Sequence, residues 1–284
     1  MRLLLAIATA TVLTSVAATP ASTSPAAPAP GLASTTSHYV SMGDSYTAGA
    51  TILPVDLRYP LCHPSLVNYP HLLAEHISTV PDSALSSFDD MSCAGNTTAD
   101  LAGGLTPQYR ALRPDTDLVT LGIGGNDIGL LGYAVACLVH LCPDDPGTGG
   151  PAPEATPAPE DMADRYAGIV RDVRDRSPHA RVVLVGYPTT IRAGGCPGVQ
   201  PVGSAAADRI RDRVTRLNDA MRSAAEHTGA EFADLEGPSH GHDACAPPET
   251  RWVEGVVPTG GSAPLHPTRL GHAAFAEQIA ALLE

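Results

Sequence analysis

Short apolar runs alternate along this chain with longer stretches of helical periodicity. Five runs have the length and composition of buried strands, and they occupy residues 39–42, 88–92, 117–123, 181–186 and 231–234. Amphipathic repeats between and after these runs predict helices, the main ones over residues 68–78, 128–139, 160–176, 204–227 and 267–283. Strands that alternate with such helices predict a parallel sheet covered on both faces, which is an α/β fold.

Some parts of the chain depart from this regular pattern. The run at 88–92 contains Asp89 and Asp90, which are uncommon in buried strands. Residues 144–159 are rich in Pro, Gly and Ala, and this composition predicts an exposed loop. Residues 236–264 carry no periodicity, so we expect irregular structure before the last helix.

The first part of the chain has the composition of a targeting segment. Met1 and Arg2 provide a positive start, and residues 3–18 are apolar or small and carry no charge. Residues 19–36 consist mainly of Pro, Ala, Ser and Thr, as in a flexible linker. We therefore predict a signal peptide over residues 1–18, a linker over 19–36 and one folded domain over 37–284. The mature protein is expected to be secreted or to lie at the cell surface.

Charge excludes one class of partner. The formal net charge is −13, and the seventeen basic residues, all arginine, form no cluster along the sequence. Nucleic acid is therefore not an expected partner, because its binding depends on a concentrated basic surface.

Six cysteines follow the predicted signal peptide. In a secreted chain, an even number of cysteines favours disulfides over metal ligands or catalytic thiols. The sequence alone leaves the connectivity open. Pairing of neighbours is the simplest arrangement, and it would give Cys62–Cys93, Cys137–Cys142 and Cys196–Cys245.

Three predicted strands end in turns that combine glycine with a polar residue. Ligand sites in parallel sheets lie beyond the carboxyl ends of the strands, so we expect these turns to converge. The three turns are Gly43-Asp44-Ser45, Cys93-Ala94-Gly95-Asn96 and Gly124-Gly125-Asn126.

Ser45 is the candidate nucleophile among these residues. The alternative is an ordinary turn in which Asp44 or Ser45 caps a helix. Ester hydrolysis needs a nucleophile, a base that takes its proton, and donors aimed at the developing oxyanion. The donors could be the backbone N–H groups of Ser45 and Gly95 and the side-chain amide of Asn126. Gly95 suits this role because it lacks a Cβ, whereas Asn126 could equally be a turn residue.

His266 is the candidate base among eleven histidines. It directly precedes Pro267, and proline is favoured at the first position of a helix. This placement predicts that His266 lies at the start of the last helix with its ring free. The alternative is a capping or surface histidine.

These four pieces together resemble the SGNH hydrolase family, also called GDSL lipases and esterases. The resemblance rests on Ser45 in Gly43-Asp44-Ser45, Gly95 in Ala94-Gly95-Asn96, Asn126 in Gly124-Gly125-Asn126-Asp127, and His266 before Pro267. All four occur in the family's order, and the resemblance spans nearly the whole chain after the linker. It implies a flavodoxin-like three-layer α/β/α sandwich around a mostly parallel five-stranded sheet.

The resemblance also implies a site and a chemistry. Ser45 and His266 would be catalytic, and Ser45, Gly95 and Asn126 would form the oxyanion hole. The cysteine placement looks like that of secreted actinobacterial lipases of the family, which carry three sequential disulfides, and this supports the neighbour pairing. The implied enzyme is a secreted monomer without a metal or other cofactor. It would hydrolyse small-molecule or lipid acyl esters and make transient contact with a lipid surface.

One position departs from the family's pattern. Many members carry Asp three residues before the catalytic histidine, and this chain has Ala263 there. The buried Asp of a serine-protease triad holds the correct imidazole tautomer. We expect a backbone carbonyl near Ala263 or Ser262 to do so here, which would give a Ser45–His266 dyad. Asp243 is the alternative third member.

Other interpretations fit the sequence less well. An α/β-hydrolase needs glycine two residues on either side of its serine, but position 47 is a threonine. A zinc site could be formed by His240, His242, Asp243 and Cys245. It is disfavoured because Cys245 has an expected disulfide partner. Two alternatives remain for function: a carbohydrate O-acetylesterase, and a non-catalytic surface binding protein that kept the fold.

Overall fold

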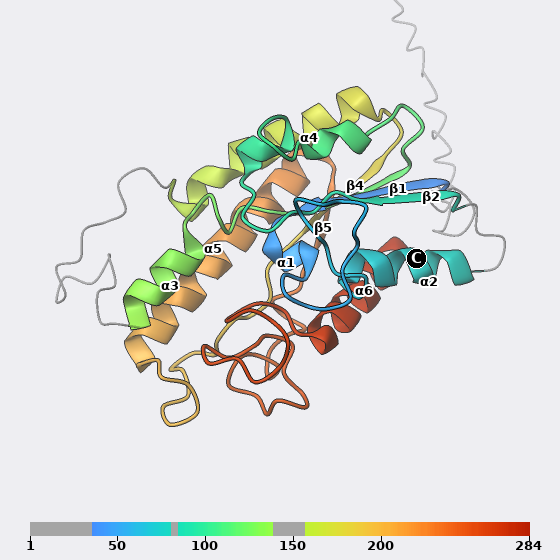
Figure 1. Cartoon of the computed structure of the whole chain (residues 1–284). Coiled ribbons are helices and arrows are strands. Elements are labelled where there is room, and N and C mark those ends of the chain that lie inside the picture. The colour runs from blue at the N-terminus through green and yellow to red at the C-terminus, as the bar shows by residue number, and fades with distance from the viewer. Residues whose placement is uncertain (1–35, 81–84, 139–156) are drawn as a thin grey trace, which may run out of the picture.

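A computed structural model describes residues 36–80, 85–138 and 157–284 (Figure 1). Its centre is a five-stranded parallel sheet with the strand order β2-β1-β3-β4-β5. The strands are β1 (His38–Gly43), β2 (Ser87–Asp90), β3 (Leu118–Gly122), β4 (Arg181–Val185) and β5 (Glu231–Ala233). The predicted α/β fold with a five-stranded sheet is confirmed. The predicted signal peptide and nearly all of the predicted linker lie outside the described residues.

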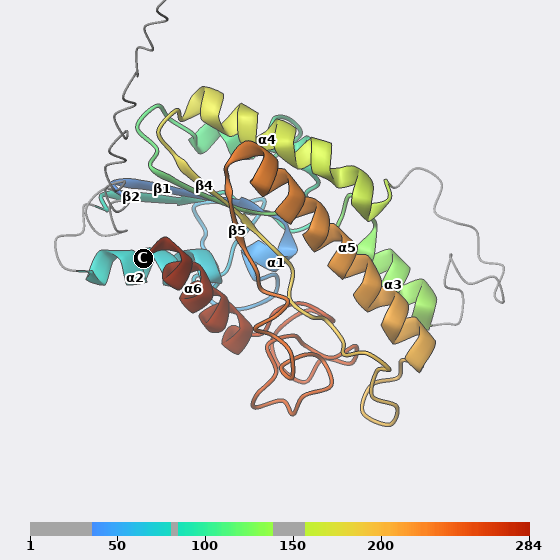
Figure 2. The ribbon, with the colours of Figure 1, turned by 180° about the vertical axis from the view of Figure 1, so that it is seen from behind.

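Helices cover both faces of the sheet. In Figures 1 and 2 one pair of helices runs along one face and a second pair along the other, which gives three layers. The first pair is α4 (Ala163–Arg176) and α5 (Ser204–Thr228), and the second is α2 (Tyr69–Thr79) and α6 (Arg269–Leu283). The shorter α3 (Leu130–Leu138) lies along α5. The described residues also contain three 3₁₀ helices: η2 (Thr98–Leu101), η3 (Gln108–Ala111) and η4 (Pro159–Met162).

The strands are apolar on both faces because each face packs on helices. Val40, Val119 and Leu184 belong to the core shared with α4 and α5. Tyr39 and Val183, at alternate positions, belong to the core shared with α2 and α6. Burial on both sides explains why the sequence shows continuous apolar runs rather than strict alternation.

The acidic strand β2 is explained by hydrogen bonds to its buried carboxylate. Asp90 is fully buried, and its Oδ2 accepts from Asn68 Nδ2 at 2.7 Å. Its Oδ1 accepts from the backbone N–H and the hydroxyl of Ser92 at 3.0 and 2.6 Å. These donors compensate for the loss of hydration, so an aspartate is tolerated at the end of the strand.

The last helix begins later than its sequence predicts. α6 starts at Arg269, and the side chain of Thr268 caps it by accepting the N–H of Gly271. Pro267 forms an isolated antiparallel bridge with Val253 instead of opening the helix. The prediction that His266 lies at the helix start was therefore wrong, because pairing with a distant segment fixes Pro267.

Two of the three predicted disulfides are present, Cys62–Cys93 and Cys196–Cys245. Cys142 lies outside the described residues, so Cys137–Cys142 stays a prediction. Within the described ranges, no helix combines the length and the hydrophobicity needed to cross a membrane.

Candidate active site

The turn after β1 places Ser45 at the carboxyl end of the sheet. Asp44 caps the one-turn helix α1 (Ser45–Ala48) by accepting the N–H of Tyr46 at 2.9 Å. Gly43 is needed for this sharp turn, because a Cβ there would lie 2.2 Å from Oγ1 of Thr47. The same Oγ1 donates to the carbonyl of Gly122 at 2.9 Å, which attaches α1 to the end of β3.

His266 reaches Ser45 from the other end of the chain. Its Nε2 lies 2.8 Å from the Ser45 hydroxyl oxygen, although 221 positions separate the two residues. Its Nδ1 lies 2.8 Å from the carbonyl oxygen of Pro264. A carbonyl can only accept, so Nδ1 carries the proton and the lone pair of Nε2 faces Ser45. Burial lowers the pKa of His266, which keeps the ring neutral.

The carbonyl that orients His266 is therefore that of Pro264, next to Ala263, in agreement with the expected backbone carbonyl near Ala263 or Ser262. The proposed alternative partner, Asp243, is occupied elsewhere. Its carboxylate accepts the Arg192 guanidinium at 3.2 Å and the N–H of Cys245 at 2.8 Å. The structure thus favours a dyad over a triad through Asp243.

Asn126 faces the same pocket as Ser45 and His266. Its side-chain nitrogen donates to the carbonyl of Asn96 at 2.8 Å, which joins the second and third turns. An amide carries two N–H groups, so one remains for an oxyanion. The predicted convergence of the three strand-end turns is therefore seen in the contacts between them.

Gly95 directly precedes Asn96, whose carbonyl accepts from the Asn126 side chain. It is exposed and is not among the residues that line the pocket. Its φ is +85°, and a Cβ built there meets nothing within 4 Å. The positive φ thus favours glycine at this position, and close approach of its N–H to a substrate carbonyl stays a prediction.

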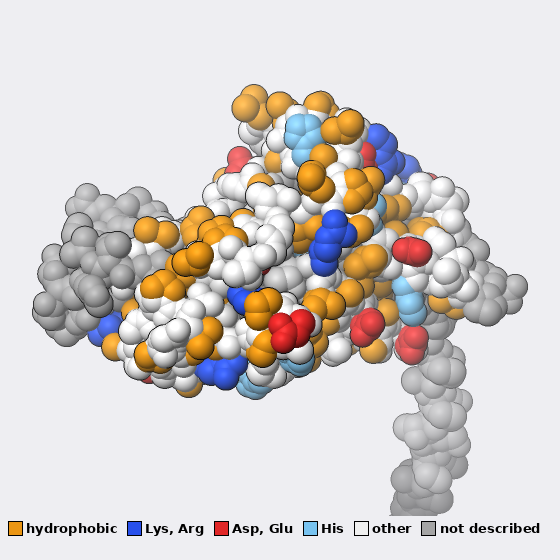
Figure 3. Space-filling model, turned by 60° about the horizontal axis from the view of Figure 1, so that its bottom comes forward, with side chains coloured by type: hydrophobic (Ala, Val, Ile, Leu, Met, Phe, Trp, Pro, Cys, Tyr) orange, Lys and Arg blue, Asp and Glu red, His pale blue; other side chains and the backbone are white. Residues whose placement is uncertain are grey.

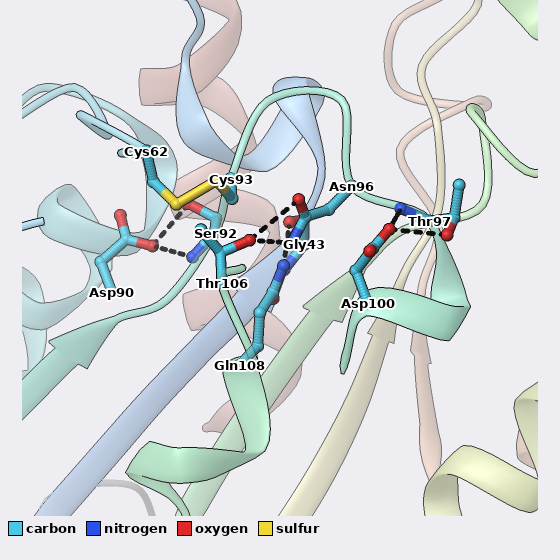
Figure 4. Close-up of a disulfide and its surroundings, with 10 residues drawn as sticks. All are labelled: Gly43, Cys62, Asp90, Ser92, Cys93, Asn96, Thr97, Asp100, Thr106 and Gln108. Atoms are coloured by element: carbon cyan, nitrogen blue, oxygen red, sulfur yellow. Dashed lines mark hydrogen bonds between the residues drawn. A yellow bond between two sulfur atoms is a disulfide. The ribbon is translucent and has the colours of Figure 1, made fainter. Parts of the chain in front are cut away.

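The Gly95 turn is held by several fixed groups, drawn in Figure 4. Cys93 forms a disulfide with Cys62, and its N–H donates to the carbonyl of Gly43 at 3.0 Å. The side-chain amide of Gln108 bonds both the N–H and the carbonyl of Gly43, at 2.7 and 2.9 Å. Sequence reasoning missed Gln108, since no local signal marks a glutamine as the partner of a distant backbone.

Apolar side chains line much of the pocket beside Ser45 and His266. They are Leu130, Leu131 and Ala134 from α3, Ile210 from α5, and Leu265. The sequence predicts these helices only as covering layers. The described part of α3 contains no charged residue. In the sequence, this absence of charge is the signal that could have indicated a helix beside an apolar site.

The residues weighed as a zinc cluster have other partners. Cys245 is bonded to Cys196, and the ring of His242 stacks on Trp252 with a centroid distance of 4.4 Å. Among the residues that the structure describes, no group of three His, Cys, Asp or Glu side chains is placed to hold a metal ion.

The fold agrees with comparisons to known proteins. Residues 41–274 match the "GDSL-like Lipase/Acylhydrolase family". The chain belongs to this family. It is 38% identical to "Lipase 2" of Streptomyces coelicolor, with 88% of this chain and 86% of that protein aligned. The "Lipase" of Streptomyces rimosus is 30% identical over 82% of this chain and 81% of its own length.

A solved structure of a related enzyme has the same fold. Phospholipase A1 from Streptomyces albidoflavus NA297 superimposes with a TM-score of 0.70 and 25% identity, over 87% of this chain and 98% of that chain. The resemblance to GDSL enzymes is thereby confirmed, and this GDSL-family member is a carboxylic ester hydrolase.

Proposed function

We propose that this GDSL-family hydrolase is a secreted serine esterase or lipase that cleaves lipid acyl esters through an acyl-enzyme. The observation that carries the proposal is the 2.8 Å contact between the Ser45 hydroxyl and Nε2 of His266. The other face of the imidazole is held by a carbonyl, so the tautomer suits a general base.

In the first step, Ser45 Oγ attacks the ester carbonyl carbon while its proton moves to Nε2 of His266. The carbonyl oxygen becomes an oxyanion that accepts from the N–H groups of Ser45 and Gly95 and from the free N–H of Asn126. When the tetrahedral intermediate collapses, the ester C–O bond breaks and Nε2 returns the proton to the departing alcohol. Ser45 is left acylated.

In the second step, His266 takes a proton from water as the water oxygen attacks the acyl-enzyme. Collapse of this intermediate returns the proton to Ser45 and releases the carboxylic acid. Without an aspartate beside Nδ1, the imidazolium formed in each step is stabilised by the Pro264 carbonyl and by the oxyanion itself.

The apolar pocket wall supports an acyl chain as the group bound beside Ser45. Leu130, Leu131, Ala134, Ile210 and Leu265 offer no charge, and aliphatic chains gain free energy by burial against such surfaces. The carbohydrate O-acetylesterase is the alternative, and it would need only a shallow acyl site.

Secretion is inferred from the leader-like residues 1–18 and from the two disulfides, which persist in oxidising compartments. The division into signal peptide, linker (19–36) and catalytic domain (37–284) is part of this proposal. N-terminal sequencing of the protein from culture medium tests it, and a mature protein that retains Met1 would contradict it.

The decisive experiment measures hydrolysis of p-nitrophenyl esters from acetate to palmitate by wild type and by Ser45→Ala. We expect activity on the longer esters in wild type and its loss in Ser45→Ala. Ser78→Ala, on α2 away from the site, is the matched control and should behave as wild type. Equal rates for wild type and Ser45→Ala would refute the serine mechanism, and activity on acetate alone would favour the acetylesterase.

A further inference from the structure

The residue that follows Ser45 contacts the loop that carries His266. The hydroxyl of Tyr46 donates a hydrogen bond to the carbonyl of Leu265, the residue directly before His266. The Tyr46 ring also lies against the imidazole, with 4.7 Å between centroids. Tyr46 therefore touches both the ring of the base and the backbone that presents it.

That backbone needs support, because Leu265 has a φ of +58°. Left-handed conformations are unfavourable for residues with a branched apolar side chain, and strain of this kind persists only where surrounding contacts enforce it. The hydrogen bond from Tyr46 to the Leu265 carbonyl is such a contact. It favours the backbone conformation that directs His266 toward Ser45.

The residue before Ser45 makes a comparable connection to the Asn126 turn. Oδ2 of the buried Asp44 accepts the Tyr187 hydroxyl at 2.5 Å. The same hydroxyl accepts the N–H of Gly125, directly before Asn126, at 2.7 Å. A tyrosine hydroxyl can donate once and accept as well, so Tyr187 links the two turns through one oxygen atom.

The two tyrosines also contact each other. The Tyr46 and Tyr187 rings meet edge to face, with 4.9 Å between centroids. Asp44, Tyr46 and Tyr187 thus form one packed unit around Ser45. The Tyr46 hydroxyl bonds the loop that carries His266, and the Tyr187 hydroxyl bonds the turn that carries Asn126.

We propose that Tyr46 and Tyr187 are positioning residues for ester hydrolysis: Tyr46 sets His266 through Leu265, and Tyr187 sets Asn126 through Asp44 and Gly125. The inference rests on the proposed serine mechanism. Neither hydroxyl exchanges a proton with substrate. Their effect is to hold base and oxyanion donor at fixed distances from Ser45, where small displacements cost rate.

Tyr46→Phe and Tyr187→Phe test the two connections separately, since each removes one hydroxyl and keeps the ring. Tyr39→Phe is the matched control. Tyr39 is also fully buried, but its hydroxyl bonds Thr120 within the sheet at 2.8 Å. Each variant is assayed below its own melting temperature with p-nitrophenyl butyrate. The rate of covalent labelling of Ser45 by a p-nitrophenyl phosphonate is measured in parallel.

For Tyr46→Phe and Tyr187→Phe we expect kcat and the limiting labelling rate to fall roughly 10-fold or more, with little change in KM. Tyr39→Phe should lose only thermal stability. The inference is overturned if the site variants retain the kcat of Tyr39→Phe, or if KM alone changes. Because the two hydroxyls make separate hydrogen bonds, the variant that folds decides its own connection if the other variant does not fold.

Failure of the proposed function gives a different result from failure of this inference. If Ser45 were not the nucleophile, the phosphonate would not label wild type and Ser45→Ala would remain active. If only the positioning roles were wrong, wild type would be labelled normally and both tyrosine variants would be labelled at the same rate.

Discussion

The Nδ1–H of His266 donates a hydrogen bond to the carbonyl oxygen of Pro264 over 2.8 Å. A carbonyl two residues away thus holds the imidazole tautomer, at a site where position 263 is alanine. The carbonyl supplies orientation without a full negative charge. Burial is then the larger influence on the base, and it lowers the pKa of His266.

The first prediction concerns pH. Catalysis requires neutral His266, and a lowered pKa keeps the ring neutral in more acidic solution. The acid limb of kcat/KM should therefore have its midpoint below the ordinary imidazole pKa of about 6.5. Initial rates with p-nitrophenyl butyrate across the acidic range test this, with circular dichroism to show that the protein remains folded. A midpoint clearly above the ordinary value would contradict it.

The second prediction concerns Asn126. Asn126→Ala removes the amide donor that faces the pocket, and we expect kcat to fall by roughly 10²–10³. Steady-state kinetics on one ester measures this effect. Asn218→Ala is an unsuitable control because its amide holds Tyr187, so the exposed Asp219→Ala on α5 serves instead. A decrease of less than about threefold would remove Asn126 from the oxyanion role.

The third prediction separates backbone strain from catalysis at Gly95. Gly95→Ala meets no neighbouring atom but must adopt a φ of +85°, so it should destabilise the fold by about 1 kcal/mol and lower kcat. Gly229→Ala, with a φ of +68° and equally free space at the end of α5, should cost similar stability and leave kcat unchanged. Urea unfolding measures the stability of both variants, and steady-state kinetics measures their kcat. Equal kcat values would show that a Cβ at position 95 does not disturb the backbone N–H that faces the oxyanion.

The fourth prediction concerns the acyl pocket. Ala134 is buried in its wall, so Ala134→Leu should fill space that a long acyl chain would occupy. We expect kcat/KM for the long esters to fall roughly 10-fold or more, with little effect on acetate. Val135→Ala, an exposed neighbour on the same helix, is the control. A uniform decrease over all chain lengths would show that the acyl group binds elsewhere.

The fifth prediction concerns stability in acid. His272 is fully buried, its Nδ1 accepts the N–H of Tyr69 at 3.1 Å, and burial lowers its pKa to about 3. The unfolded chain protonates this histidine near its ordinary pKa and the folded protein does not, so stability is lost as pH falls below that value. Between pH 7 and pH 5 the loss from this group should be about 2 kcal/mol.

Urea unfolding of wild type and His272→Gln at both pH values measures that loss. The variant should show the smaller decrease in the free energy of unfolding on acidification, whatever its stability at neutral pH. Identical pH dependence in the two proteins would mean that His272 is not a buried neutral histidine.

The sequence by itself determined the layers of the fold, the strand ends and the candidate nucleophile. Apolar periodicity and turn residues report on near neighbours in the chain, so they predicted the five strands and Ser45 after Gly43. Pairing of neighbouring cysteines, which the family resemblance supported, is confirmed for two pairs.

Only the tertiary structure decided how the site is assembled. His266 meets Ser45 across 221 positions, and the carbonyl of Pro264 orients its ring. Tyr187 bonds the N–H of Gly125 and Ile210 lines the pocket, although nothing in the sequence marks either as a site residue. Such contacts depend on packing between distant segments, which local periodicity does not encode. The Ser45–His266 pair is therefore a property of the folded chain, although each residue stands in its own short motif.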